Sequence, residues 1–202
     1  SLEENSLVIP YTVQTAGSIL FEPAQDLALP YLKMDEEDRP VADGLALFSG
    51  RSYTGENLSA TQGVLLNILN ESLGRTARIS YLYEGSPVSI VINRAKNDVS
   101  VSEKEIEINN KLEVVVSEFP RDHLRDQEIR LALQQFLSKQ IEKDMNEIMG
   151  KLQEAKSDAI GLGRIVRAYH PRLYQEDWSK HFATLNIPIN VDVEIVKTGV
   201  LY

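Results

Sequence analysis

The sequence predicts an α+β protein in which an antiparallel β-meander is covered by one long amphipathic helix. Three observations predict it. Apolar residues recur every second position from about residue 76 to residue 119, and at helical spacing between residues 124 and 157. From Ile187 to Ile195 the last strand alternates apolar and polar residues strictly. A sheet with one apolar face needs a cover, and the long helix offers a matching apolar stripe.

The meander is predicted from the two-residue period and from the residues that interrupt it. We expect breaks at residues 85–87, where Gly-Ser-Pro occurs, and at the Lys-Asn-Asp of residues 96–98. A further turn is expected at Asn109-Asn110, because asparagine tolerates positive φ. The alternating apolar positions are Ile79, Tyr81, Tyr83, Val88, Ile90, Ile92, Ile106, Ile108, Leu112, Val114 and Val116.

The long helix is expected over residues 124–157, with Asp122 or Asp126 as its N-cap. Its opposite face is charged, and Glu147 and Lys151 have the favourable i, i+4 order. A stripe this narrow suits either a coiled-coil seam or a helix lying across the sheet, and the uncovered sheet favours the second. The apolar stripe comprises Leu133, Leu137, Ile141, Met145, Ile148, Leu152 and Ala155, and the charged face comprises Lys139, Glu142, Lys143, Glu147 and Lys151.

Residues 1–75 predict a smaller N-terminal α+β unit, and residues 76–202 a C-terminal domain. Four prolines divide the first 43 residues, with brief strands expected at residues 7–9 and 19–21. Residues 44–48 read as a short buried strand that ends in a turn.

A helix follows Ser59, because Ser59 and Gln62 have the spacing of a capping box, and Gly74 is a candidate C-terminal cap. The acidic run of residues 35–38 lacks the alternating ligands and the glycine of a calcium loop, so it is expected to be a solvated loop. A second, shorter helix is expected over residues 159–169 of the C-terminal domain.

Composition and motif searches exclude several functions. The formal net charge of −9, with no local cluster of Lys or Arg, argues against nucleic-acid binding. Without cysteine there is no disulfide, thiolate nucleophile or cysteine metal site, and the three histidines match no zinc spacing. No Gly-x-Ser-x-Gly elbow occurs, and no apolar run approaches the ~20 residues of a membrane span. We therefore expect a protein that is not an enzyme and needs no cofactor.

Gly161 and Gly163 form the one glycine pattern that could cradle a phosphate. A dinucleotide site would require a preceding strand and a third glycine, whereas a helix is expected before this segment and Val166 stands in the third position. The better interpretation is a close helix–helix junction, with Asp158 capping the second helix.

The segment from Lys151 to Gly199 resembles the C-terminal region of the Ger(x)C family, the C subunits of GerA-type nutrient germinant receptors. The resemblance lies in an Asp-x-x-Gly-x-Gly turn, a His-Pro, a Trp followed by Phe, and a final strand closing on glycine. Residues 29–32 and 44–48 are similar to the family's middle domain. The fingerprint residues, expected to be structural, are Asp158, Gly161, Gly163, Trp178 and Gly199.

This resemblance implies a non-catalytic subunit that is required for spore germination and acts through protein–protein contacts. Its expected partners are the integral-membrane A and B subunits of the receptor. The parent protein is expected on the outer face of the spore inner membrane, held by an N-terminal lipid anchor that this soluble fragment lacks. The family contributes no catalytic, cofactor-binding or metal-binding residues.

Two other functions remain open from the sequence. One is a small-molecule domain that binds the germinant itself, with a pocket near Trp178 and Tyr174. The other is a hydrolase whose carboxylate pair forms only in the folded chain, because the chain has 30 acidic residues and none stands out.

Overall fold

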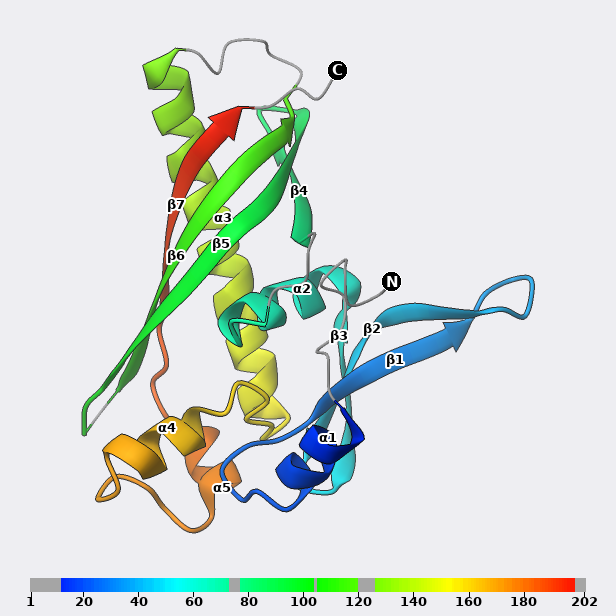
Figure 1. The fold of residues 1–202 in the computed structure, drawn as a ribbon, viewed down its shortest axis with the longest axis vertical. Coiled ribbons are helices and arrows are strands. Elements are labelled where there is room, and N and C mark those ends of the chain that lie inside the picture. Colours follow the sequence, from blue (N-terminus) through cyan, green and yellow to red (C-terminus); the bar gives the residue numbers. More distant parts are fainter. Residues whose placement is uncertain (1–11, 73–76, 104, 120–125, 199–202) are drawn as a thin grey trace.

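Two β-sheets and five helices make up the part of the chain that this computed structural model describes, residues 12–72, 77–103, 105–119 and 126–198. The small sheet has the strand order β1-β2-β3 and the large sheet the order β4-β5-β6-β7 (Figure 1). The strands are β1 Ala28–Met34, β2 Pro40–Ser49, β3 Ser52–Ser59, β4 Ala77–Tyr83, β5 Ser86–Val101, β6 Ile106–Glu118 and β7 Ile189–Thr198. The helices are α1 Val13–Leu20, α2 Ala60–Leu69, α3 Gln127–Glu154, α4 Leu162–Tyr169 and α5 Trp178–Phe182.

The large sheet confirms the predicted α+β class with its antiparallel meander. Strands β4, β5 and β6 pair antiparallel in chain order, and β7 returns to pair parallel with β6. The parallel return requires a long crossover, which α3, α4 and α5 provide.

The turns predicted at residues 96–98 and at Asn109-Asn110 are wrong, because both segments lie inside the long strands β5 and β6. Asn97 and Asn110 are cross-strand partners, and the Asn110 Nδ2 donates to the Asn97 Oδ1 at 2.5 Å. The Asn97 Nδ2 in turn donates to the carbonyl oxygens of Ile68 and Leu69, at 3.2 and 2.8 Å. Asn97 therefore satisfies two C-terminal carbonyls of α2, Asn110 supports the Asn97 side chain, and neither residue turns the chain.

Helix α3 lies against the apolar face of the large sheet, which confirms that the helix covers the meander. All seven predicted stripe residues are buried. On the β4 side, the Tyr81 hydroxyl donates to the Asp144 carboxylate at 2.9 Å, and Tyr83 packs edge-on against Phe136 with ring centroids 5.0 Å apart. The helix begins after its N-cap Asp126 and ends at Glu154, so residues 155–157 lie beyond it. Residues 122, 124 and 125 lie outside the described chain.

A row of polar side chains on α3 closes the outer edge of β7. Gln134, Ser138, Glu142 and Asn146 stand four residues apart on one side of the helix. Four helical residues rise about 6 Å and two strand residues about 6.6 Å, so the two spacings match. An exposed edge strand invites pairing with other chains, and here the helix occupies that edge. These side chains accept, in order, from the backbone N–H groups of Ile195, Val193, Val191 and Ile189 at 3.0 to 3.1 Å.

The charged face predicted for α3 needs two corrections. Glu142 accepts the Val191 N–H and is half-buried, so it belongs to the sheet edge and not to the solvent face. Lys151 donates to the Gln62 side chain at 3.1 Å, while Glu147 pairs with Lys143 at 3.7 Å. The expected Glu147–Lys151 pair is absent from the contacts of these described residues, because α2 offers Lys151 a partly buried acceptor.

The small sheet is a long hairpin of β1 and β2 with β3 beside its base. Helix α2 follows directly, and the Ser59–Gln62 capping box is confirmed by both of its bonds, at 3.1 and 3.3 Å. The strand predicted at residues 19–21 is wrong, since these residues end α1, a helix that the Thr12 hydroxyl caps. Residues 7–9 and Gly74 lie outside the described chain.

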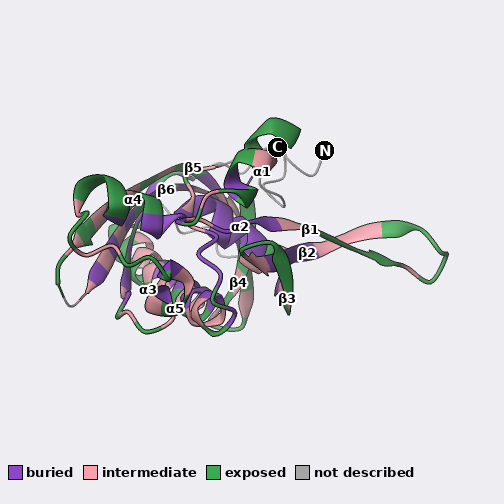
Figure 2. Ribbon diagram, turned by 90° about the horizontal axis from the view of Figure 1, so that it is seen from below, coloured by how far each residue is buried: buried purple, intermediate pink, exposed green. Residues whose placement is uncertain are grey.

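The buried side chains of both sheets form one hydrophobic cluster with α2, α3, α4 and α5. In Figure 2 the buried residues lie where the sheets and helices meet, whereas the far end of the β1–β2 hairpin is exposed. The division into domains at residue 75 stays a prediction, and its boundary falls within residues 73–76, outside the described chain.

Candidate functional site

The turn between α3 and α4 is built around the buried carboxylate of Asp158. Its Oδ1 accepts from the backbone N–H groups of Gly161 and Leu162 at 2.8 and 3.0 Å, and its Oδ2 from that of Gly163 at 2.7 Å. These donors are the free N–H groups at the start of α4, where the helix dipole favours a negative charge. Gly161 has a φ of +78°, a conformation that strains other residues. The Asp-x-x-Gly-x-Gly pattern thus forms a helix start.

Trp178 supplies the fourth N–H to this carboxylate from the beginning of α5. Its Nε1 donates to the Asp158 Oδ2 at 2.7 Å, and its ring stacks on Tyr174 with centroids 5.5 Å apart. A Cβ at Gly163 would lie 2.5 Å from the Trp178 Nε1 and 2.7 Å from the Ala24 carbonyl oxygen. Because Gly163 has no Cβ, the Trp178 indole can lie close to the start of α4.

A second buried carboxylate, Asp26, connects this turn to the small sheet. The Asp158 N–H donates to the Asp26 Oδ2 at 2.8 Å, and the Asp26 N–H donates to the Asp158 carbonyl oxygen at 3.0 Å. The Asp26 Oδ1 accepts from the Gly50 N–H in the β2–β3 turn at 2.6 Å. In the same turn, the Ser49 hydroxyl donates to the Lys156 carbonyl oxygen at 2.9 Å. We call Asp26, Asp158 and Trp178 the aspartate junction, since together they join the small sheet to α4 and α5.

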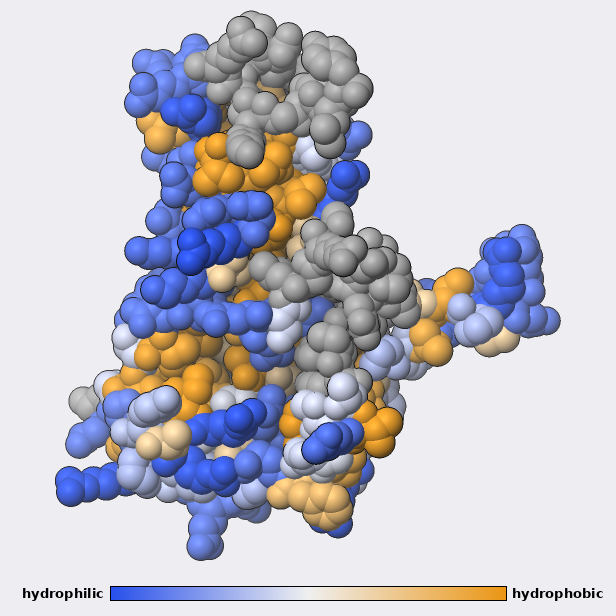
Figure 3. Space-filling model, in the orientation of Figure 1, coloured by the Kyte–Doolittle hydropathy of each residue, from blue (hydrophilic) through white to orange (hydrophobic). Residues whose placement is uncertain are grey.

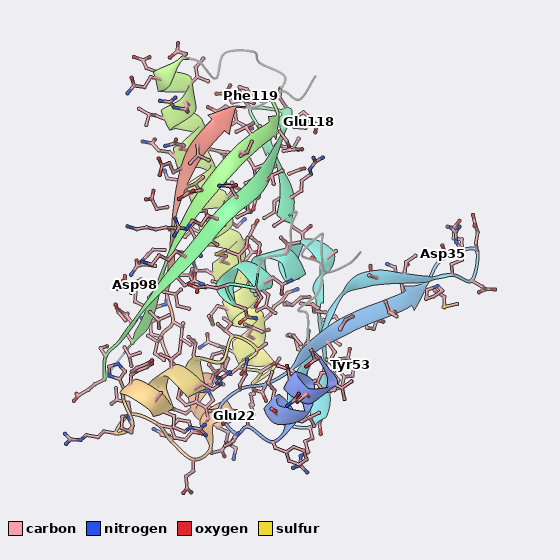
Figure 4. All side chains as sticks on the ribbon, viewed as in Figure 1. Glu22, Asp35, Tyr53, Asp98, Glu118 and Phe119 are labelled. Carbon is pink, nitrogen blue, oxygen red and sulfur yellow. The ribbon has the colours of Figure 1, made fainter. Side chains whose placement is uncertain are left out.

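Two arginines of α4 hold the chain segment that leads to Asp26. Arg167 forms an ion pair with Glu22 at 2.8 Å, and the Arg164 guanidinium donates to the Gln25 side chain at 2.9 Å. Figure 4 places Glu22 beside α1, on the side of the molecule where α5 lies. These contacts are partly exposed, so they orient the segment more than they stabilise it.

Burial sets the protonation of the junction. Burial and, to a smaller extent, the nearby charge of Asp26 raise the pKa of Asp158 to about 6, although the N–H groups of Gly163, Trp178 and Leu162 favour the carboxylate. Burial also raises the pKa of Asp26, against the bonds from Gly50 and Asp158. The folded protein therefore holds a proton at Asp158 more tightly than the unfolded chain, whose reference value is 3.8.

This shift predicts a specific pH dependence of stability. A carboxyl whose folded pKa is raised contributes stability that is complete below about pH 4 and is lost as the pH rises through about 6. We expect the wild-type protein to lose unfolding free energy, relative to Asp158→Asn, between pH 4 and pH 7. Urea titrations of both proteins across this range measure the difference, and a difference that stays constant with pH would contradict the assignment.

The structure brings four of the five predicted fingerprint residues into one site. Asp158, Gly161, Gly163 and Trp178 lie in contact, while Gly199 is outside the described chain. Their status as a family fingerprint stays a prediction. Sequence reasoning missed Asp26, which lies 132 positions away from its partner in a proline-broken segment without periodicity.

The junction does not offer its carboxylates to a substrate. Asp158 has 0% and Asp26 5% of its surface exposed, and all four carboxylate oxygens accept backbone or indole N–H groups. Within the described ranges, no group of three or more acidic or histidine side chains is placed to hold a metal ion. None of the helices in the same ranges is long and apolar enough to span a bilayer.

Fold and junction together define a class of protein: an α+β domain with a helix-covered sheet, in which two buried carboxylates, Asp26 and Asp158, connect the small sheet to the helices. The family of spore germination B3/GerAC-like C-terminal domains matches residues 43–199. The chain belongs to this family, and the resemblance to the Ger(x)C family is confirmed.

Two relatives share this fold or sequence. Spore germination protein KC of Bacillus subtilis (strain 168) is 24% identical over 172 residues, which cover 78% of this chain and 41% of that protein. The crystal structure of the GerBC protein matches with a TM-score of 0.72 at 20% identity, covering 93% of this chain and 61% of that one. The chain thus spans less than two thirds of either relative.

Proposed function

We propose that this chain is part of the C subunit of a nutrient germinant receptor and acts through protein–protein contacts, without catalysis. The observation that carries the proposal is the family match over residues 43–199. The junction supports it, because the buried Asp158 carboxylate is enclosed by N–H donors and serves architecture.

The proposed partners are the integral-membrane A and B subunits of the receptor. The parent protein would be lipid-anchored through a segment outside this chain, on the outer face of the spore inner membrane. Contacts with the membrane subunits would then come from the exposed surfaces of this domain, since the apolar face of the large sheet and its β7 edge are occupied by α3.

Deletion of the parent gene in a spore former tests the proposal. We expect spores to lose the response to at least one nutrient while germination by non-nutrient agents continues. Restoring the wild-type gene should restore the response. Normal nutrient germination in the deletion, with no second copy of the gene present, would contradict the proposed role.

Germinant binding by this domain is the alternative, favoured by a cavity beside Trp178. Its volume is about 160 Å³, below the roughly 300 Å³ of ordinary small-molecule sites. Trp178 is the single tryptophan, so its fluorescence reports any ligand there. A saturable change on titration with nutrients would favour binding over a purely structural role. The cavity is lined by Val101, Ser102, Glu103, Ile106, Val166, Arg172, Leu173, Gln175, Trp178, His181 and Leu185.

A further inference from the structure

The core face of the small sheet continues past its helical cover onto a two-stranded arm, residues 30–43. Helix α2 packs against β2 and β3. Strand β3 pairs with β2 only between Gly44 and Ser49, and α2 begins directly after Ser59, the partner of Gly44. Figures 1 and 2 show β1 and β2 running on from this point, away from α2 and from the large sheet. A two-stranded ribbon without a covered face is marginally stable in water, so the arm needs a neighbour.

One face of the arm is the direct continuation of the buried core face. Alternate residues of β1 point the same way, so Leu32 and Met34 follow Ala28 on one face of the strand. Their cross-strand partners, Ala42 and Pro40, extend the apolar surface onto β2. Ala28 is 0% exposed, whereas Leu32 and Met34 are 54% and 58% exposed. The core face therefore runs out into solvent where its cover within the described residues ends.

Hydrogen bonds and ion pairs at its tip and its base hold the arm in shape. At the tip, Asp35 accepts the N–H groups of Glu37 and Arg39 at 2.9 Å and pairs with the Arg39 guanidinium. At the base, Asp43 has no partner in the strand register and forms an ion pair with Lys33 at 2.7 Å. Figure 4 labels Asp35 at the far end, and Figure 3 shows apolar surface between this hydrophilic end and the rest of the molecule. A ribbon shaped in advance loses little further entropy when its face is covered.

The relatives of this chain supply the neighbour. The chain spans less than two thirds of either relative, and the matching family describes a C-terminal domain. The remainder of such a protein therefore lies largely ahead of the matched segment. Because β1 comes first among the described strands, that remainder would be tethered close to the arm. A neighbour on the same chain has an effective concentration of order millimolar, which a separate partner does not reach.

We propose that the domain preceding this segment in the parent chain packs on the apolar face of the arm and covers Leu32 and Met34. Removal of the two side chains from water stabilises the contact, and the covered surface joins the existing core beside α2. The arm then fixes the orientation of the preceding domain. Strand β2 leads from the arm to the turn at Gly50, which donates to Asp26, so the contact is linked to the aspartate junction. The contact lies within one chain and does not depend on the proposed function.

Charge and backbone chemistry argue against occupants from outside the chain. Glu36 and Asp38 are exposed at the tip, and a second copy would bring another such tip and another net charge of −9. Anionic lipid repels the same tip. An added β-strand would gain few bonds at the arm, because Pro30 and Pro40 have no N–H to donate. Side-chain packing by a tethered domain is subject to neither constraint.

Photo-crosslinking in the full-length parent protein tests the proposal. A photoreactive amino acid replaces Leu32 in one variant and, as a matched control, Leu82 of β4, which is 71% exposed on the large sheet. Mass spectrometry of the digested protein locates the crosslinks. We expect position 32 to crosslink within its own chain, to a peptide that precedes residue 1 of this sequence, and position 82 to give no crosslink to that region.

Four outcomes would overturn the assignment of the arm. They are a crosslink from position 32 to a second copy, one to lipid, one to another protein such as a membrane subunit, and the lack of any crosslink from this position. Loss of the nutrient response on gene deletion is measured separately, so failure of this contact and failure of the proposed function are distinguished.

Limited proteolysis of the same full-length protein measures the strength of the contact. The double variant Leu32→Ser, Met34→Ser should be cleaved between the preceding domain and this segment about tenfold faster than the wild type, because the apolar burial is lost. Both positions are exposed within this segment, so its own fold is preserved. Leu82→Ser is the control, with an expected cleavage rate equal to that of the wild type. An unchanged rate in the double variant would show that the preceding domain does not cover the arm.

Discussion

Asp158→Ala is expected to lower the free energy of unfolding by about 4 kcal/mol, a large part of the stability of an ordinary domain. The substitution leaves four buried N–H groups without their acceptor, those of Gly161, Leu162, Gly163 and the Trp178 indole. Relief of the repulsion between the two carboxylates of the junction offsets only part of this loss. Asp26 keeps both of its N–H donors, because the one at position 158 belongs to the backbone and remains in alanine. Urea unfolding followed by far-ultraviolet circular dichroism measures the change.

Asp177→Ala is the matched control for this substitution. Asp177 precedes Trp178, but its side chain is exposed and pairs only with Lys180 in solvent. We expect its unfolding transition to coincide with that of the wild type. An Asp158→Ala protein as stable as the Asp177→Ala protein would show that the junction does not hold the fold together.

Gly163→Ala is expected to cost about 3 kcal/mol through overpacking. The new methyl group would lie 2.5 Å from the Trp178 Nε1 and 2.7 Å from the Ala24 carbonyl oxygen. Neither neighbour yields easily, since one is a buried ring bonded to Asp158 and the other is backbone. The expected result is a lower unfolding midpoint with a weakened indole–carboxylate contact, visible as a shift in Trp178 fluorescence.

Gly150→Ala separates this clash from the general effect of replacing glycine in a helix. Gly150 lies inside α3, and a Cβ there would meet nothing within 4 Å. Alanine is the better helix former by up to ~1 kcal/mol, so this control should be as stable as the wild type or more stable. Equal losses from both substitutions would contradict the close approach at Gly163.

Local patterns in the sequence predicted the elements that depend on local physics. The stripe of α3, the alternation of β7 and the Ser59 capping box follow from periodicity and from side chains a few positions apart, and the structure contains all three. The role of Asp158 as a helix cap could be predicted for the same reason, since its carboxylate oxygens accept from backbone N–H groups only three to five residues away.

Contacts between distant segments escaped prediction. Asn97 and Asn110 look like turn residues, but their side chains bond each other and the end of α2, which only the folded register brings near. From the sequence, the polar row on α3 is expected to face solvent, whereas in the fold these side chains accept the N–H groups of β7. Asp26 carries no local signal, because its partners are turns that lie far along the chain.

Amide hydrogen exchange at the aspartate junction tests most directly whether it is an architectural element of the fold. The N–H groups of Asp158, Gly163 and Gly50 each donate to a junction carboxylate. If the junction joins the sheets, these three amides exchange only through global unfolding, as slowly as the amides of β6. Exchange of the three amides by local opening, orders of magnitude faster than in β6, would contradict that role.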